Sequence, residues 1–184
     1  MAEYILKDMV RKAGREAEFE IASAATSREE IGNDMYPPAK DILKEHGVPF
    51  GRHHARQITA ADFDYYDYVI VMEGRQIASM ALRFPRESMG KLSRLMDYSA
   101  RPGDVSDPWY SRDFDTAFRD IEEGCRGLLE KLRKSFLGLR VISQLSIISA
   151  AFFNMLSFSA SSVARYFSGA AVSATQPASC GCRE

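Results

Sequence analysis

Apolar residues recur along the first 133 residues at the spacing of one helix face, and they predict a series of helices. The first begins at Met1 and ends near Gly14, a residue type that commonly stops a helix. Further helices are predicted over residues 37–47 and 76–82, with a short helical turn at 60–65. The longest one follows, with an apolar stripe formed by Phe114, Phe118, Ile121, Cys125, Leu128, Leu129 and Leu132.

Shorter segments between these helices have the composition of strands. Apolar and charged residues alternate from Glu18 to Ile21, which predicts a strand ending near Ser23. Residues 68–72 (Tyr-Val-Ile-Val-Met) are continuously apolar, as in a strand buried on both faces, and residues 92–96 are a third candidate. Strands alternating with helices predict an α/β fold of three layers, in which helices cover both faces of a parallel sheet. Ligands of such sheets bind beyond the carboxyl ends of the strands.

Charge divides the chain into two regions. The net charge of the 184 residues is −1, so nothing points to a nucleic-acid partner. Residues 134–184 hold only five charged groups, whereas residues 1–133 hold the other 44. We therefore predict an α/β domain over 1–133 and a C-terminal extension over 134–184, hydrophobic at first and then rich in Ser and Ala. No signal-peptide pattern opens the chain and the three cysteines suggest no disulfide framework, so a cytoplasmic protein is expected.

The extension contains a long uncharged segment at residues 141–164. Its length permits a membrane-spanning helix, since about 20 apolar residues suffice, and Lys131, Arg133, Lys134 and Arg140 would lie on the cytoplasmic side. Gln144, Asn154 and several serines dilute its hydrophobicity. The alternatives are a buried or frayed helical extension, and a C-terminus without a selected role.

Several short motifs occur in a specific order along residues 1–133. They are Met1-Ala2-Glu3, Ser23-Ala24-Ala25-Thr26-Ser27, Glu30-Ile31-Gly32-Asn33, His46-Gly47-Val48-Pro49, His53-His54-Ala55-Arg56-Gln57-Ile58-Thr59, Asp62-Phe63, Asp67-Tyr68-Val69-Ile70 and Asp107-Pro108-Trp109-Tyr110. Together they resemble the low-molecular-weight protein tyrosine phosphatases. That family transfers a phosphoryl group from phosphotyrosine to a cysteine thiolate and then to water, without a metal or another cofactor.

The resemblance implies a role for six residues of this chain. Asp107 would be the general acid that protonates the leaving phenolate, with Pro108 fixing the backbone after it. Trp109 and Tyr110 would form an aromatic wall for the substrate's phenyl ring. Ser23 and His53 would hydrogen-bond to the phosphate-binding loop and hold its shape. Read without the resemblance, Asp-Pro is an ordinary turn signal, and His53 has no metal-ligand spacing around it.

The most diagnostic motif of the family, Cys-x5-Arg before the first helix, does not occur in the 184 residues. The strand that should precede it is also missing, and the family's sheet order 2-1-3-4 makes that strand an interior one. The strand at residues 19–23 is thus expected to lack a neighbour, so that the chain folds poorly or only after rearrangement. A second departure is Glu73-Gly74-Arg75-Gln76, where the family often has Asp-x-x-Asn.

Three functions remain open at this point. The first is a tyrosine phosphatase acting on a phosphotyrosine protein or a small aryl phosphate. The second is a catalytically inactive binding or regulatory module, tethered to a membrane if residues 141–164 insert into one. The third is an arsenate reductase, which uses the same fold but needs relay cysteines that are absent from residues 1–124. Cys125 falls on the apolar stripe of the last helix and is expected to be a buried hydrophobe.

Overall fold

The computed structural model of the chain describes residues 1–138 and 145–150. Helices and strands alternate along these residues as the sequence predicts, and the long amphipathic helix is the last helix described. The elements in chain order are α1 (Ala2–Lys12), η1 (Glu16–Glu18), β1 (Phe19–Ala24), α2 (Pro37–Glu45), α3 (Ala60–Tyr65), β2 (Tyr68–Val71), α4 (Gly74–Ala81), η2 (Arg86–Lys91), β3 (Leu92–Arg94), η3 (Leu95–Tyr98), α5 (Pro108–Ser111), α6 (Phe114–Gly138) and β4 (Leu145–Ala150), where η marks a 3-10 helix.

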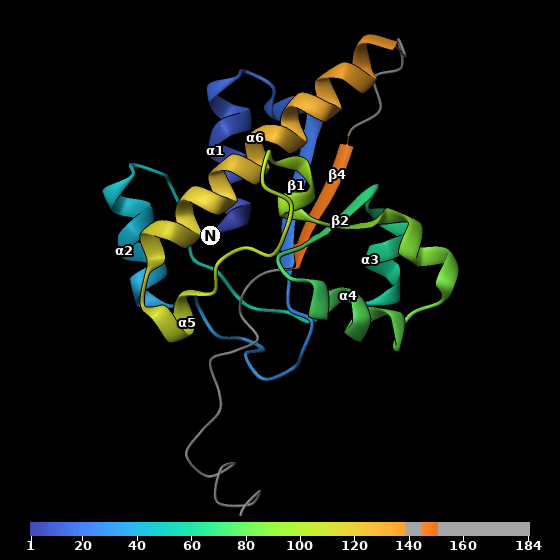
Figure 1. The fold of residues 1–184 in the computed structure, drawn as a ribbon, viewed down its shortest axis with the longest axis horizontal. Helices are drawn as coiled ribbons and strands as arrows, with labels where there is room; N and C mark the ends of the chain where they lie inside the picture. Colours follow the sequence, from blue (N-terminus) through green and yellow to red (C-terminus); the bar gives the residue numbers. More distant parts are fainter. Residues whose placement is uncertain (139–144, 151–184) are drawn as a thin grey trace, which may run out of the picture.

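The four strands form one parallel sheet in the order β1-β4-β2-β3. β4 comes from the C-terminal extension, yet it lies between β1 and β2 (Figure 1). It pairs with all six residues of β1, from Phe19 opposite Leu145 to Ala24 opposite Ala150, and with all four residues of β2. The prediction that the first strand lacks a neighbour is therefore wrong for this structure.

The composition of β4 explains why it fits an interior position. Its sequence, Leu-Ser-Ile-Ile-Ser-Ala, carries no charge and includes two β-branched isoleucines, and such segments suit strands with neighbours on both sides. The sequence analysis predicts for this region a membrane-spanning helix, a buried or frayed helical extension or a C-terminus without a selected role, and no strand. Within the described residues no helix is long and apolar enough to cross a membrane. The remainder of residues 141–164 lies outside the described part of the chain.

The predicted boundary after residue 133 stays a prediction. Helix α6 continues across it to Gly138, and β4 shares the sheet with strands of the first region. Residues 139–144 and 151–184, including the Ser- and Ala-rich end of the extension, lie outside the described residues.

Helices cover the sheet on both faces, as predicted, and each face has its own apolar core (Figure 1). α1, α2 and α6 lie on one face, and α3 and α4 lie on the other. Successive residues of β2 alternate between the two cores: Val69 and Val71 belong to the core of α3 and α4, whereas Ile70 belongs to the other. This explains the uninterrupted apolar run of β2, since both of its faces are buried.

The predicted strand at residues 92–96 is shorter than expected. β3 ends at Arg94, and η3 begins at Leu95. The turn is stabilised by Asp97, whose carboxylate accepts hydrogen bonds from the backbone N–H of Arg94 at 3.3 Å and from its guanidinium Nη2 at 2.8 Å. A side chain that bonds backbone three residues earlier favours a helical turn over continued strand.

α6 approaches η3 so closely that a glycine is required at the contact. A Cβ atom at Gly127 would stand 1.9 Å from the carbonyl oxygen of Tyr98, and one at Gly124 would stand 2.6 Å from Leu95 Cγ. The two glycines therefore let the helix backbone rest directly on the segment that follows β3. This contact fixes the start of the chain segment that leads to Asp107.

Candidate active site

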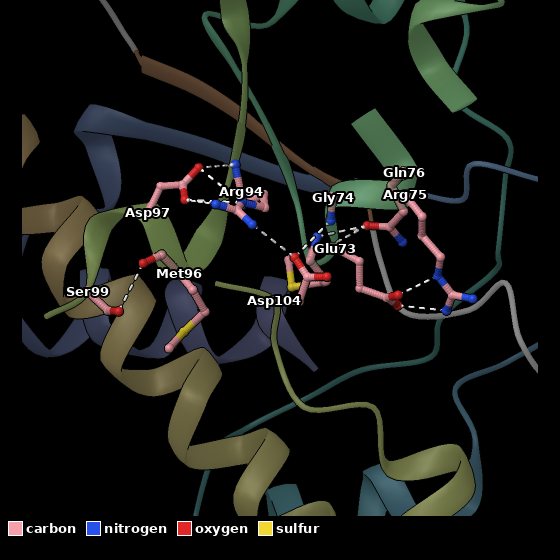
Figure 2. Close-up of polar contacts among 10 residues, drawn as sticks. Glu73, Gly74, Arg75, Gln76, Arg94, Met96, Asp97, Ser99 and Asp104 are labelled. Atoms are coloured by element: carbon pink, nitrogen blue, oxygen red, sulfur yellow. Dashed lines mark hydrogen bonds and ion pairs between the residues drawn. The ribbon is translucent and has the colours of Figure 1, made fainter. Parts of the chain in front are cut away.

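The chain segment that carries Asp107 is attached to the end of β2. The backbone N–H of Val105 donates to the carbonyl oxygen of Met72 at 2.9 Å, and the backbone N–H of Gly74 donates to Asp104 Oδ1 at 2.9 Å (Figure 2). Because the strands are parallel, their carboxyl ends lie along one edge of the sheet. Asp107 is thereby held at the edge where ligands of such sheets bind.

Asp107 directly precedes α5, the single helical turn that begins with Pro108. Its side chain is 18% exposed, and Arg75 Nη2 lies 3.6 Å from its Oδ2. Proline is favoured at the first position of a helix, so Pro108 fixes the backbone immediately after the carboxylate. Trp109 and Tyr110 belong to α5, but their side chains lie outside what the structure describes, so their role as an aromatic wall stays a prediction.

The turn after β2 departs from the family pattern in sequence but is well ordered by hydrogen bonds. The buried amide of Gln76 accepts, through Oε1, from the backbone N–H of Met72 at 2.8 Å and from that of Glu73 at 3.1 Å (Figure 2). Asp104 is also held by Arg94, whose Nη1 lies 3.2 Å from Asp104 Oδ1. The substitutions in this turn therefore preserve a tight junction between β2 and the segment of Asp107.

Ser23 and His53, both predicted to support the site, are brought together by Glu3 in the first turn of α1. Ser23 Oγ donates a short hydrogen bond to Glu3 Oε2, and His53 Nδ1 lies 3.9 Å from the same oxygen. Lys7 Nζ contacts the other oxygen of Glu3 at 2.5 Å. The backbone N–H of His53 is held separately, by Asp34 Oδ1 at 3.2 Å. Glu3 thus links strand β1, helix α1 and the loop of His53.

The electrostatics of this cluster keep Glu3 ionised. Burial by itself raises the pKa of Glu3, but the hydrogen bonds from Lys7 and Ser23 and the charge of Lys7 outweigh it, so the pKa lies below its usual value. Burial lowers the pKa of His53, and the charge of Glu3 only partly opposes this. The arrangement at neutral pH is therefore a carboxylate with an ammonium on one side and a neutral imidazole on the other.

Two residues of the site escaped the sequence interpretation. The sequence motifs place Glu3 only at the start of a helix and Arg75 only within a departure from the family pattern. No local signal links Glu3 to Ser23, or Arg75 to Asp107, because each pair is joined by packing between distant segments.

Cys125 is not a nucleophile. It lies on α6 with 1% of its surface exposed, as the apolar stripe predicted. Burial raises the pKa of its thiol to about 12, so it stays protonated at neutral pH, whereas a nucleophilic cysteine needs a lowered pKa. It is the one cysteine among the residues that the structure describes.

The sequence pattern of the low molecular weight phosphotyrosine protein phosphatases matches residues 1–137. This chain belongs to that family. YfkJ of Bacillus subtilis, a low molecular weight protein-tyrosine-phosphatase, is 32% identical over 136 residues, which are 73% of this phosphatase chain and 87% of YfkJ. The human low molecular weight phosphotyrosine protein phosphatase is 30% identical over 136 residues, covering 71% of this chain and 85% of the human protein.

Solved structures agree with this assignment. The crystal structure of YfkJ superimposes with a TM-score of 0.70 at 32% identity, covering 73% of this chain and 86% of YfkJ. That of the low molecular weight protein tyrosine phosphatase SP-PTP from Streptococcus pyogenes gives a TM-score of 0.65 at 27% identity, covering 76% and 89% of the two chains. The resemblance found in the sequence is thus confirmed. β4 lies beyond the residues that match the family pattern.

Proposed function

We propose that this phosphatase hydrolyses phosphotyrosine, or a small aryl phosphate, through a cysteinyl-phosphate intermediate and that Asp107 is its general acid. The observation that carries the proposal is the position of Asp107 at the edge of the sheet, mostly shielded from solvent and joined to the turn after β2. A carboxyl group in that position is suited to deliver a proton to a leaving oxygen.

In the proposed reaction a cysteine thiolate attacks the phosphorus atom, and the bond between phosphorus and the phenolic oxygen breaks. The electron pair of that bond stays with the phenolic oxygen, which takes the proton of Asp107 and leaves as a phenol. Asp107 becomes a carboxylate, and water later releases phosphate from the cysteine. Trp109 and Tyr110 are proposed to stack against the phenyl ring.

The proposal requires a Cys-x5-Arg loop, which the 184 residues do not contain. In the family this loop comes directly before the first helix, and here α1 begins at Ala2. The cluster of Ser23, His53 and Glu3 lies at that helix start, which supports their proposed role in holding the loop. We propose that a Cys-x5-Arg loop ahead of Met1 supplies the nucleophile.

Two measurements on the protein isolated from its own cells test the proposal. Mass spectrometry of its N-terminal peptide is expected to reveal a Cys-x5-Arg motif ahead of Met1, and the protein is expected to hydrolyse phenyl phosphate. Asp107→Ala in that full-length form should slow the hydrolysis of phenyl phosphate by about 10²–10⁴-fold. It should slow the hydrolysis of 4-nitrophenyl phosphate much less, because the 4-nitrophenolate leaving group needs no proton. An N-terminus at Met1 together with no hydrolysis would overturn the proposal.

The position of β4 favours a second function, a catalytically inactive binding or regulatory module. In the family's sheet order the place between β1 and β2 belongs to the strand that leads into the phosphate-binding loop, and here β4 occupies it. Recombinant 1–184 is then expected to fold and to retain a specific protein partner in a pull-down, without hydrolysing phenyl phosphate. Turnover of phenyl phosphate by recombinant 1–184 would exclude this function.

A further inference from the structure

Arg75 lies between two carboxylates at the start of α4. Its Nη2 donates a hydrogen bond to Glu73 Oε1 at 2.9 Å and lies 3.6 Å from Asp107 Oδ2. Its Nε makes a second, short contact with Glu73 Oε2. Figure 2 shows the guanidinium of Arg75 turned towards the carboxylate of Glu73. The three side chains form a row, with the guanidinium between two carboxyl groups, that ends at the proposed general acid.

The guanidinium is held by a rigid support. The Glu73 side chain is 12% exposed, and its carboxylate contacts both Nε and Nη2 of Arg75. These two contacts hold the half-exposed guanidinium in place. The turn that carries both residues is anchored to the strand by Gln76 and to the segment of Asp107 by Asp104. A charged group on such a support can orient its neighbour without first being ordered itself.

We propose that Arg75 is a positioning residue for Asp107, which orients the carboxyl group and stabilises the carboxylate left after proton donation. The inference rests on the proposed function and deepens it, because it assigns a role to a residue outside the motifs shared with the family. The relevant charge develops late: Asp107 is neutral before it donates and anionic afterwards. The Arg75 guanidinium, fixed 3.6 Å away, is placed to orient the carboxyl group and to face the charge that develops on it.

The alternative role, plain stabilisation of the fold, makes a different prediction. Exposed ion pairs contribute little to stability, and Arg75 is 55% exposed. Loss of the Arg75 charge should therefore change the rate of proton donation more than it changes the free energy of unfolding. Arg94 offers a matched control, because it holds the same chain segment through Asp104 and its guanidinium contacts Asp97 and Asp104.

The test compares Arg75→Gln, Arg75→Lys and Arg94→Gln in the full-length protein on two substrates. Phenyl phosphate has a leaving group that needs a proton, and 4-nitrophenyl phosphate has one that does not. Arg75→Gln is expected to lower kcat for phenyl phosphate about tenfold more than kcat for 4-nitrophenyl phosphate, which is about 1.4 kcal/mol of the barrier. Arg75→Lys should restore part of the loss, and Arg94→Gln should leave the ratio of the two rates unchanged.

A double variant separates positioning from general damage. If Arg75 acts through Asp107, adding Arg75→Gln to Asp107→Ala should not slow the hydrolysis of phenyl phosphate any further. Equal losses on both substrates in Arg75→Gln, or a further loss in the double variant, would overturn the proposal.

The ion pair itself is measured independently of turnover. The carboxyl ¹³C resonance of Asp107, assigned with Asp107→Asn, should move in Arg75→Gln and stay in place in Arg94→Gln. An unmoved resonance in Arg75→Gln overturns the pairing even in an active enzyme. No hydrolysis by the wild-type protein overturns the proposed function, and with it any catalytic role of Arg75, even where the resonance moves.

Discussion

Ending the chain at Gly138 removes β4 and is expected to abolish cooperative folding. In the described sheet β1 and β2 are joined through β4, which pairs with six residues of the one and four of the other. Each backbone group that loses its partner and stays buried costs about 1–3 kcal/mol. If only three of the groups that pair with β4 stay buried and unpaired, the loss is about 3–9 kcal/mol. A domain is stable by only about 5–15 kcal/mol, so this loss is comparable with the whole.

The matched control ends at Ala150 and keeps every described strand. Thermal unfolding of both chains, followed by far-ultraviolet circular dichroism, is expected to give a sharp transition for the control and none for the chain that ends at Gly138. If the shorter chain unfolds cooperatively with a Tm within about 4 °C of the control, β4 contributes little and the reasoning is refuted.

The register of β4 is open to a direct chemical check. Ala22 and Ile148 are paired across β1 and β4, so cysteines at both positions should form a disulfide in a background with Cys180 and Cys182 replaced by serine. Cysteines at Ala22 and Leu145 are the control, because three residues along a strand add about 10 Å. A bridge in the control and none in the paired variant would show another register.

Three further outcomes are expected. Glu3→Gln should lower the free energy of unfolding, measured in urea at pH 7, by about 1–2 kcal/mol. Since folding lowers the pKa of Glu3, this difference should persist above about pH 5 and shrink as the pH falls below about 4. A difference that grows in acid would contradict the assignment. Gly127→Ala should cost about 1–3 kcal/mol because its Cβ would meet the carbonyl oxygen of Tyr98, whereas Gly90→Ala, with open space around it, should be nearly neutral. Cys125 should react with iodoacetamide only after unfolding, and alkylation of Cys125 itself in the native protein at pH 8, located by peptide mass spectrometry, would contradict its burial.

Local patterns were sufficient for the elements that bury apolar residues at a regular spacing. The continuous run of β2 predicted a strand covered on both faces, and the stripe of α6 predicted a long helix with Cys125 inside. The family resemblance added the order of these elements and the candidate residues Ser23, His53 and Asp107. The predictions of β2 and α6 held because each depends on residues close together in the chain, whereas the roles of Ser23, His53 and Asp107 stay predictions.

The parts that the sequence did not predict depend on contacts between distant segments. The hydrophobic extension is long enough for a membrane helix and also contains a six-residue segment suited to a strand. The segment forms a strand because it pairs with β1, and this pairing joins residues far apart in the sequence. Likewise Arg75 lies far along the chain from Asp107, and its carboxylate partner Glu73 is equally compatible with an ordinary helix start. The predicted end of β3 at residue 96 is wrong because the Asp97 carboxylate accepts a hydrogen bond from the backbone N–H of Arg94, which turns the chain there.

The place of β4 also sets the order of events on the ribosome. Phe19 cannot find its partner Leu145, nor Tyr68 its partner Ile147, until the ribosome has passed residue 145. Until then the nascent chain carries two strands with open edges, which invite pairing with other chains. Such long-range closure is slow and leaves intermediates exposed. Production of this protein is therefore expected to depend on chaperones that hold the early strands apart while translation finishes.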